Sequence, residues 1–247
     1  MNDPTTTVHA LNAEAGQEPI WRTLQRLGAR FPGRVALSTA FGREGQVLMD
    51  MVFTRKLPVQ VFTLDTGRLF QETHDVYQRT VDKYGQAIRV YYPEAAEVEN
   101  LVREHGPNSF YQSVEHRKAC CGIRKMHPLA RALKGKAVWV SGVRAGQSRH
   151  RSSLAPFQWD ERFGVIKYHP LLAWSEAEVN DYIHAHGVPY NTLHDKGFRS
   201  IGCAPCTRAV KPGEDVRSGR WWWENSNHKE CGLHENYFEN LNLEVAK

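Results

Sequence analysis

The 247-residue chain lacks the features that mark membrane, secreted or fibrous proteins. No apolar run approaches the roughly 18 residues of a membrane-spanning helix. The first residues, MNDPTTTVHALNAEAGQEP, contain acids instead of leading bases and have no apolar core, so they do not resemble a secretion signal. Hydrophobic residues make up 41% and charged residues 24%, which excludes a disordered tail, a collagen-like fibre and a coiled coil. We therefore expect a soluble, cytoplasmic protein without a membrane partner.

Cysteine is scarce, and its count is odd. The five cysteines, in a chain without a secretion signal, argue against a disulfide framework. Cys120 and Cys121 are adjacent, Cys203 and Cys206 form a CxxC motif, and Cys231 stands alone near the end. This arrangement predicts a site with four thiolate ligands and one spare thiol.

The four paired cysteines indicate a metal centre, because thiolates bind zinc or iron–sulfur clusters. Zinc sites are usually built from two CxxC knuckles around one small ion, and an adjacent Cys-Cys pair fits that knuckle poorly. It fits a [4Fe–4S] cluster better, since neighbouring thiolates can reach different irons. Zinc and buried structural thiols remain the alternatives. An anionic cluster would be stabilised by the cations around the first pair, which are Arg117, Lys118, Arg124 and Lys125.

The fifth cysteine has a different setting. Lone cysteines are usually inert core residues. Cys231, however, has polar flanks, and Lys229, His228 and His234 would favour its thiolate form. The sequence leaves open whether Cys231 is inert or a nucleophile that closes over a bound substrate.

Strand-like and helix-like segments alternate over the first three-quarters of the chain. This alternation predicts a twisted parallel sheet with helices on both faces. Strands are expected at 35–38, 59–64, 87–91, 137–140 and 165–168, and helices at 46–55, before Gly85, and from Ser175 to Gly187. We expect a single domain over 1–234, with its nucleotide-binding sheet at about 30–190, an irregular ligand-organised segment at about 191–234, and a C-terminal tail at 235–247.

Three predicted strand ends carry residues suited to a ligand. They are Ser38–Gly45, Leu64–Gly67 and Ser141–Arg144, and ligands of open α/β sheets bind at the carboxyl ends of the strands. Backbone N–H groups before a helix favour an anion there. Each loop alone is weak evidence for a ligand site, because a simple turn has the same composition. None is a Walker A loop or a GxGxxG loop.

Basic residues concentrate in one window, with ten Lys or Arg and a single acid between Phe110 and Arg151. This indicates one anionic partner, either nucleic acid or a small phosphorylated or sulfated ligand, and a solvated helix face is the plainer interpretation. A zinc-stabilised RNA-binding or tRNA-modifying protein would use Trp221–Trp223 for stacking. The same tryptophans would otherwise pack around the cysteine segment.

Six segments, in order, carry a family resemblance: LDTGRLFQET, KACCGIRK, SGVRAGQS, IGCAPCTR, GRWWW and KECGLH. Together they resemble the assimilatory adenylyl-sulfate reductases of the iron–sulfur type, within the PAPS reductase family, over roughly Val35 to His234. The implied fold is similar to that of the adenine nucleotide alpha hydrolases. The loop Ser38–Gly45 departs from the SGGxDS form of ATP-using relatives, which fits a reductase better than an ATP hydrolase.

The resemblance also assigns roles to individual residues. It implies a [4Fe–4S] cluster on Cys120, Cys121, Cys203 and Cys206, and a nucleophile at Cys231. It places Lys125 between cluster and substrate. The implied substrate contacts are Arg217 and Arg220 on the phosphosulfate, the backbones of Thr39, Leu64 and Gly142 on the adenosine, and Arg144 as a further candidate.

The activity implied by the resemblance is the reduction of adenosine 5'-phosphosulfate to sulfite and AMP in assimilatory sulfate reduction, on the route to cysteine. Attack by Cys231 would leave an S-sulfocysteine, and a second thiol would release sulfite. The other four cysteines are committed to the cluster, so the reductant is expected to be external thioredoxin. A reductase for the 3'-phosphorylated substrate, or for both, is the nearest alternative. We expect no nucleic-acid partner, and the oligomeric state is left open.

Overall fold

The computed structural model describes residues 3–148 and 151–224. The strands of this part are β1 (Val35–Thr39), β2 (Gln60–Leu64), β3 (Arg89–Tyr91), β4 (Val138–Val140), β5 (Phe157–Asp160) and β6 (Val165–Tyr168). The α-helices are α1 (Pro4–Glu14), α2 (Ile20–Arg30), α3 (Arg43–Thr54), α4 (Gln71–Tyr84), α5 (Ala95–His105), α6 (Val114–Cys121), α7 (His127–Leu133) and α8 (Glu176–Ala185). No helix in these residues is both long and apolar enough to span a membrane.

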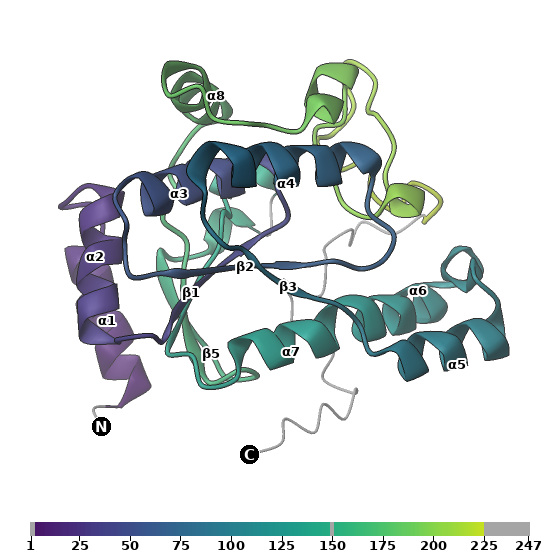
Figure 1. The fold of residues 1–247 in the computed structure, drawn as a ribbon, viewed down its shortest axis with the longest axis horizontal. Coiled ribbons are helices and arrows are strands. Elements are labelled where there is room, and N and C mark those ends of the chain that lie inside the picture. The colour runs from purple at the N-terminus through teal and green to yellow at the C-terminus, as the bar shows by residue number, and fades with distance from the viewer. Residues whose placement is uncertain (1–2, 149–150, 225–247) are drawn as a thin grey trace. The chain divides into compact units, whose positions relative to one another are not determined.

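The strands form one sheet in the order β3-β2-β1-β4-β6-β5 (Figure 1). β1 pairs in parallel with β2 and β4, and β4 pairs in parallel with β6. The predicted fold class is therefore confirmed. β5 was not expected and is antiparallel to β6, because a short turn returns the chain from Asp160 to Val165 and an antiparallel partner needs no crossover.

The central strands are apolar on both sides, as a covered parallel sheet requires. Leu37 of β1 is aligned with Val61 of β2 and with Val140 of β4, and Leu37 and Val140 are fully buried. At the edge, the rings of Phe157 and Tyr168 stack with centroids 4.2 Å apart. β1 and β4 thus form the middle of the sheet.

The chain divides into two compact units. The first contains Met1–Thr63, Gln71–Arg89 and Leu133–His194, and holds most of the sheet with α1 to α4 and α8. The second contains Leu64–Phe70, Val90–Ala132 and the described residues that follow His194, and holds α5 and α6. The prediction of a single domain stays a prediction.

Within the first unit, helices α3, α4 and α8 lie along the same side of the sheet (Figure 1). Asp50 of α3 is buried and accepts hydrogen bonds from the hydroxyls of Tyr84 at 2.7 Å and Tyr182 at 2.8 Å. One carboxylate thus ties the three helices together. The predicted capping box at the start of α8 is present, since Ser175 and Glu178 each accept from the other's backbone N–H.

Helix boundaries differ modestly from the expectations. α3 begins at Arg43, three residues before the predicted start, because Gly42 serves as its N-cap and the loop is shorter than the composition suggested. α1, α2, α5, α6 and α7 were not predicted individually. After Asp195 the described chain contains only short helical turns, as the loss of periodicity there indicated.

Candidate functional site

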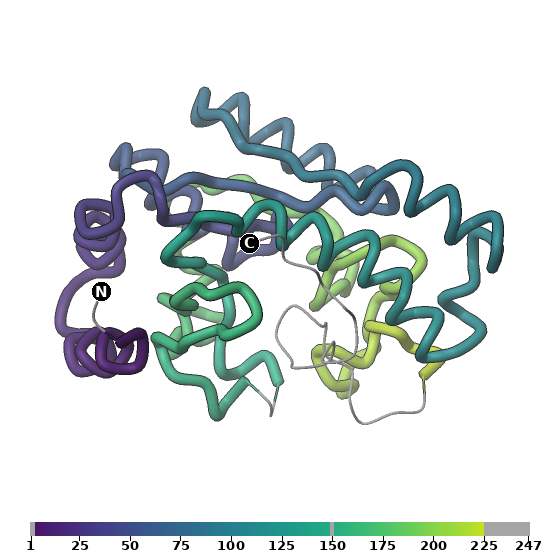
Figure 2. Tube along the Cα trace, turned by 90° about the horizontal axis from the view of Figure 1, so that it is seen from below, coloured from purple at the N-terminus to yellow at the C-terminus, as the bar shows by residue number. Residues whose placement is uncertain are grey.

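The adjacent cysteines lie at the end of a capped helix. Ser113 caps α6 by accepting a hydrogen bond from the backbone N–H of His116 at 3.2 Å, and the helix ends at Cys120 and Cys121. A π-helical turn, Gly122–Met126, follows and leads into α7. The trace from residue 114 to 133 therefore forms one continuous helical path (Figure 2).

The π-helical turn changes the direction in which the following side chains point. Neighbouring residues of an α-helix project about 100° apart, and a π-helical turn inserts one extra residue, so the phase shifts after Cys121. Such turns occur often at functional sites. In this chain the turn carries Arg124 and Lys125, which line the same cavity as the cysteines.

The CxxC motif wraps around a short 3-10 turn, Ala204–Cys206. The backbone N–H of Cys206 donates to the carbonyl of Cys203 at 3.0 Å, and Pro205 fixes the turn between them. Ala204 donates its N–H to the carbonyl of Arg68 at 2.8 Å, which anchors the turn to the loop after β2. Both sulfur-bearing side chains are buried.

The two cysteine pairs meet at one cavity in the second unit. None of these four cysteines forms a disulfide, and only Cys120 is partly exposed. The cavity is lined by Arg68, Phe110, Arg117, Cys120, Cys121, Arg124, Lys125, Cys203, Pro205 and Cys206. The structure thus brings together all four predicted ligands and Lys125, from segments about 80 residues apart in a chain of 247.

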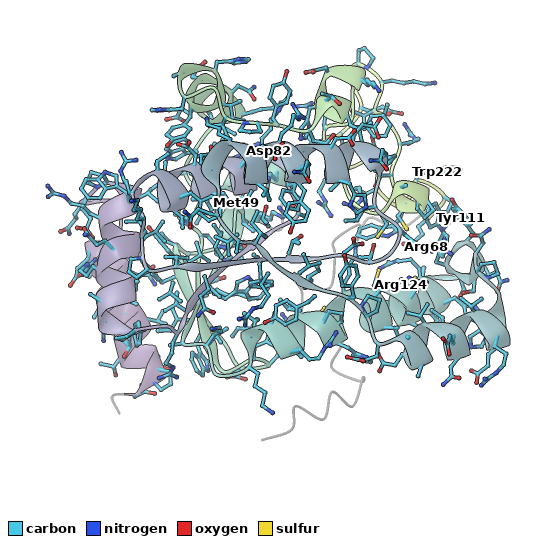
Figure 3. All side chains as sticks on the ribbon, in the orientation of Figure 1. Met49, Arg68, Asp82, Tyr111, Arg124 and Trp222 are labelled. Carbon is cyan, nitrogen blue, oxygen red and sulfur yellow. The ribbon has the colours of Figure 1, made fainter. Side chains whose placement is uncertain are left out.

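The loop after β2 contributes residues that the sequence analysis did not assign to this site. The hydroxyl of Thr66 lies 3.3 Å from the Cys203 sulfur, and Arg124 donates from Nη1 to the Thr66 carbonyl at 2.7 Å. Arg68 lies beside the cavity, and the side-chain view shows Arg68 and Arg124 near its sulfur atoms (Figure 3). The signal was present in LDTGRLFQET, which contributed to the family resemblance and to a predicted strand end but was not connected with the cysteines.

The cysteine thiols are held in a desolvated, cationic setting. Burial and, after it, the charge of Cys203 raise the pKa of Cys206 to about 12, although Lys125 and Arg220 act in the opposite direction. Burial likewise raises the pKa of Cys120, against the charges of Arg124, Lys125 and Arg68. Binding of metal by such thiols therefore requires that the metal and these cations compensate for the lost solvation.

Several buried N–H donors around the cysteines have no hydrogen-bond partner in the described part of the chain. They are Arg124 Nε, Arg220 Nε, Trp221 Nε1 and Trp223 Nε1. Trp221 and Trp223 pack in one cluster with Cys120, Cys203 and Cys206, and Arg124 lines the cavity of the cysteines. Buried donors normally have an acceptor, and the sulfurs of an iron–sulfur cluster accept hydrogen bonds. The donor set therefore fits a cluster.

The spacing of the thiols bears on the zinc alternative. Within residues 3–148 and 151–224, no group of three or more His, Cys, Asp or Glu side chains is arranged to hold a metal ion. The prediction of a cluster in place of zinc therefore stays a prediction.

The predicted phosphosulfate arginines lie in the segment after the CxxC motif. Arg217 and Arg220 are both buried, and the backbone N–H of Arg220 donates to the carbonyl of Arg217 at 2.9 Å. Arg220 lies close enough to Cys206 for its charge to affect that thiol. Of the tryptophans beside them, Trp221 is fully buried and Trp222 is half exposed.

The remaining predicted contacts, apart from Leu64, belong to the first unit. Thr39 ends β1, and its hydroxyl accepts from the backbone N–H of Phe41 at 3.0 Å. Gly142 follows β4, and a Cβ there would lie 2.9 Å from the Cβ of Glu44 at the start of α3. Gly142 must therefore be glycine for the loop to approach the helix. Leu64 ends β2 and is the first residue of the second unit.

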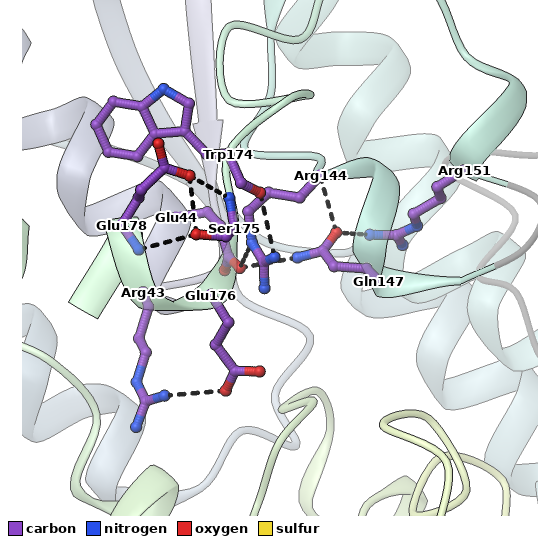
Figure 4. A network of polar contacts seen from close by, with 9 residues as sticks. All are labelled: Arg43, Glu44, Arg144, Gln147, Arg151, Trp174, Ser175, Glu176 and Glu178. Atoms are coloured by element: carbon purple, nitrogen blue, oxygen red, sulfur yellow. Dashed lines mark hydrogen bonds and ion pairs between the residues drawn. The ribbon is translucent and has the colours of Figure 1, made fainter. Parts of the chain in front are cut away.

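Arg144 lies in a polar network next to these loops (Figure 4). Its Nε donates to Glu44 at 2.7 Å, and its backbone N–H donates to the Gln147 side chain at 3.1 Å. Gln147 donates in turn to Glu44 at 3.0 Å. The guanidinium also reaches the Trp174 carbonyl at 3.4 Å, so Arg144 is buried and engaged by protein groups.

A second polar contact supports the same loop. The hydroxyl of Ser141 lies 2.9 Å from Nδ1 of His169, and both residues are buried. Burial, followed by the charges of Lys167 and Arg151, lowers the pKa of His169 to about 3. His169 is therefore neutral at physiological pH and acts as a fixed hydrogen-bonding group.

The predicted nucleophile, Cys231, lies outside the described residues.

The sequence of the chain is similar to that of known sulfonucleotide reductases. The family model for the phosphoadenosine phosphosulfate reductase domain matches residues 34–209. The chain is 47% identical over 208 residues to the adenosine 5'-phosphosulfate reductase of Sinorhizobium fredii, covering 84% of this chain and 83% of that protein. It is 42% identical over 240 residues to the protein of the same name from Agrobacterium fabrum, covering 94% and 92%.

Solved structures agree at the level of the fold. A phosphoadenylyl-sulfate reductase from Candida auris superimposes with a TM-score of 0.73 and 28% identity, covering 85% of this chain and 99% of that one. An FMN adenylyltransferase from Candida glabrata superimposes with a TM-score of 0.54 and 15% identity, covering 92% and 78%. The second similarity indicates a shared fold alone.

Proposed function

The chain belongs to the phosphoadenosine phosphosulfate reductase family, and on that premise we propose that it reduces adenosine 5'-phosphosulfate to sulfite and AMP. The observation that carries the proposal is the convergence of Cys120, Cys121, Cys203 and Cys206 on one cavity that basic residues surround. Relatives of 42% to 49% identity that bear the name adenosine 5'-phosphosulfate reductase support the choice of substrate.

The four cysteines would hold a [4Fe–4S] cluster. The donor set supports this, because cations line the cavity of the four thiols and buried N–H groups without an acceptor lie in the same segments. When bound, the cluster would cross-link the two cysteine segments and supply a redox-capable anionic centre. Lys125 and Arg124 would balance its charge from the π-helical turn, and Thr66 would contact the Cys203 sulfur.

The substrate is a mixed anhydride whose negative charge opposes the approach of a thiolate. Cations must neutralise that charge before attack, and Lys125, Arg217 and Arg220 are the residues we assign to this role. The strand-end backbones at Thr39, Leu64 and Gly142 would hold the adenosine. Arg144 contributes indirectly, because Glu44 already engages its guanidinium.

The chemistry we assign to Cys231 has two displacements. Its thiolate attacks the sulfur of the substrate, the bond from that sulfur to the bridging oxygen breaks, and AMP leaves with the electron pair of that bond. The enzyme then carries an S-sulfocysteine. A thiolate of an external dithiol attacks the Cys231 sulfur, sulfite leaves with the electron pair of the S–S bond, and the donor's second thiol resolves the mixed disulfide.

Thioredoxin is the external dithiol that we propose. The electron balance of the reaction requires an external dithiol, because the sulfur of the substrate is reduced while the donor is oxidised from dithiol to disulfide. The chain itself offers no second thiol for this step, since its other four cysteines are assigned to the cluster. The proposed setting is assimilatory sulfate reduction in the cytoplasm, which supplies sulfite for cysteine synthesis.

The test traps the intermediate. Protein mixed with adenosine 5'-phosphosulfate and no reductant should release one AMP per active chain and carry one SO₃ group on the peptide that contains Cys231. Thioredoxin should then remove that mass and release sulfite. A Cys231→Ser variant should bind substrate but form no adduct. An adduct on one of the paired cysteines, or AMP release without any adduct, contradicts the proposed mechanism.

The 3'-phosphorylated substrate is the second candidate, and the similarity to the Candida auris phosphoadenylyl-sulfate reductase favours testing it. Steady-state assays with the two nucleotides decide between them. We expect kcat/KM to be larger for adenosine 5'-phosphosulfate, in line with the relatives of higher identity. A larger value for the 3'-phosphorylated nucleotide would reverse the assignment of substrate but keep that of reductase.

A further inference from the structure

A buried ion pair joins the helix of the adjacent cysteines to the segment after the CxxC motif. Arg117 lies on α6, three residues before Cys120, and Glu224 is the last described residue. Nε of Arg117 donates to Glu224 Oε1 at 2.8 Å, and Nη2 donates to Oε2 at 2.9 Å. The two side chains are only 1% and 3% exposed. This is a bidentate, desolvated pair, the strongest form of such a contact.

Trp221 connects this ion pair to the rest of the segment. The guanidinium carbons of Arg117 and Arg220 each lie 4.7 Å from the centre of the Trp221 ring. The backbone N–H of Trp221 donates to the Cys206 carbonyl at 3.2 Å, and Glu224 donates its N–H to the Trp221 carbonyl at 2.9 Å. Trp221 has a φ of 42°, a conformation that a non-glycine residue adopts only when its surroundings impose it.

The segment is also tied to the CxxC motif through its backbone. Thr207 and Arg220 form an antiparallel bridge, and Arg208 donates its N–H to the Gly219 carbonyl at 3.0 Å. Backbone hydrogen bonds therefore join the Cys203–Cys206 turn to the stretch that ends at Glu224. A contact that fixes Glu224 consequently also fixes Cys206.

We propose that the Arg117–Glu224 pair is a positioning clamp, which holds the Cys203–Cys206 turn against the Cys120–Cys121 helix whether or not a metal centre is bound. The clamp acts through Trp221, and so it also sets the place of Arg220. The site is then organised before its metal arrives. The inference rests on the proposed function only for the identity of the metal centre. The contacts of Arg117, Trp221 and Glu224 are all made within the polypeptide and do not depend on that identity.

The geometry explains why arginine is needed. A lysine at residue 117 would keep the charge but could not donate two parallel hydrogen bonds while it lies against an indole ring. Glutamine at residue 224 would keep the shape but leave the Arg117 charge buried without a counter-ion, which is costly. Both substitutions should therefore loosen the clamp, and Glu224→Gln should do so more severely.

The test measures thiol exposure in the full chain after chelation of metal under reducing, anaerobic conditions. Maleimide labelling of Cys203 and Cys206, followed by peptide mass spectrometry, reports how often the turn separates from α6. Glu224→Gln should accelerate labelling by about tenfold or more relative to the parent, and Arg117→Lys should give an intermediate acceleration. Asp160→Asn is the matched control, because it removes a buried carboxylate, 4% exposed and 2.5 Å from Lys167, in the first unit.

A second readout follows metal retention in protein that has not been chelated. The chelator concentration that removes half of the bound iron should fall by about tenfold in Glu224→Gln and stay at the parent value in Asp160→Asn. Equal labelling in the parent, Glu224→Gln and Arg117→Lys would overturn the clamp, as would equal acceleration by Asp160→Asn. If Glu224→Gln does not fold, the comparison of Arg117→Lys with Asp160→Asn decides. A parent that binds no iron would refute the proposed cluster, while the labelling experiment would still judge the clamp.

Discussion

Glu44 accepts a 2.7 Å hydrogen bond from Nε of Arg144, and this pair joins the first turn of α3 to the loop that follows β4. Both side chains are mostly buried, at 16% and 9% exposure. The close approach of Gly142 to Glu44 belongs to the same contact. Arg144 is therefore a positioning residue for the loop after β4, and its charge is already balanced.

A double-mutant cycle tests this relationship. Glu44→Gln, Arg144→Gln and the double variant should show a coupling of about 0.5–3 kcal/mol in the free energy of unfolding, because each single change leaves a partner unsatisfied. Denaturant titration gives the four values. The more exposed Arg43–Glu176 pair, at 3.5 Å, is the control and should couple by less than about 1 kcal/mol. Additive effects at Glu44 and Arg144 would show that the pair does not support the loops.

Loss of one paired cysteine should abolish the metal centre. The parent, purified without oxygen, should be brown and contain about four irons and four acid-labile sulfides per chain. Cys203→Ser should lose the visible absorption and most of the iron, since three thiolates remain. Cys231→Ser is the matched control and should keep both. Colourless parent protein with full activity would contradict the cluster assignment.

Removal of the Arg220 charge should weaken substrate binding. Arg220→Ala should cost about 1.5–3 kcal/mol in the binding free energy of adenosine 5'-phosphosulfate, the value of a charge-assisted contact. Isothermal titration with Cys231→Ser as background measures binding without turnover. Arg208→Ala removes an arginine that is paired with Glu214 in the same segment, and it should bind like the parent. Equal affinities for both variants would place the substrate elsewhere.

His169 should make the fold sensitive to acid. Its folded pKa of about 3 lies below the unfolded value of about 6.5, so between these pH values only the unfolded chain takes up the proton. Stability is therefore unaffected above about pH 6.5 and falls as pH decreases, by at most about 1.4 kcal/mol per pH unit from this group. The free energy of unfolding of His169→Gln should depend less steeply on pH than that of the parent between pH 6 and about 4. Parallel curves for parent and His169→Gln would contradict the neutral state.

The sequence predicted the local features of the fold and the composition of the site. Short apolar runs predicted strands at 35–38 and 137–140, and the structure has strands at Val35–Thr39 and Val138–Val140. The adjacent cysteines and the distant CxxC motif predicted one thiolate site, and the structure lines one cavity with all four. Spacing carries this information because ligand chemistry restricts which residues can share a centre.

Only the tertiary structure decided which side chains meet. Arg117 meets Glu224 and Thr66 meets Cys203 across more than a hundred residues of chain, and Glu44 engages an arginine that the sequence offered as a substrate contact. Periodicity tells which face of an element is buried, but not which other element covers it. The partner of a buried charge depends on how separate helices and loops pack, so the same arginine can bind a ligand or a neighbouring carboxylate without any change in its local sequence.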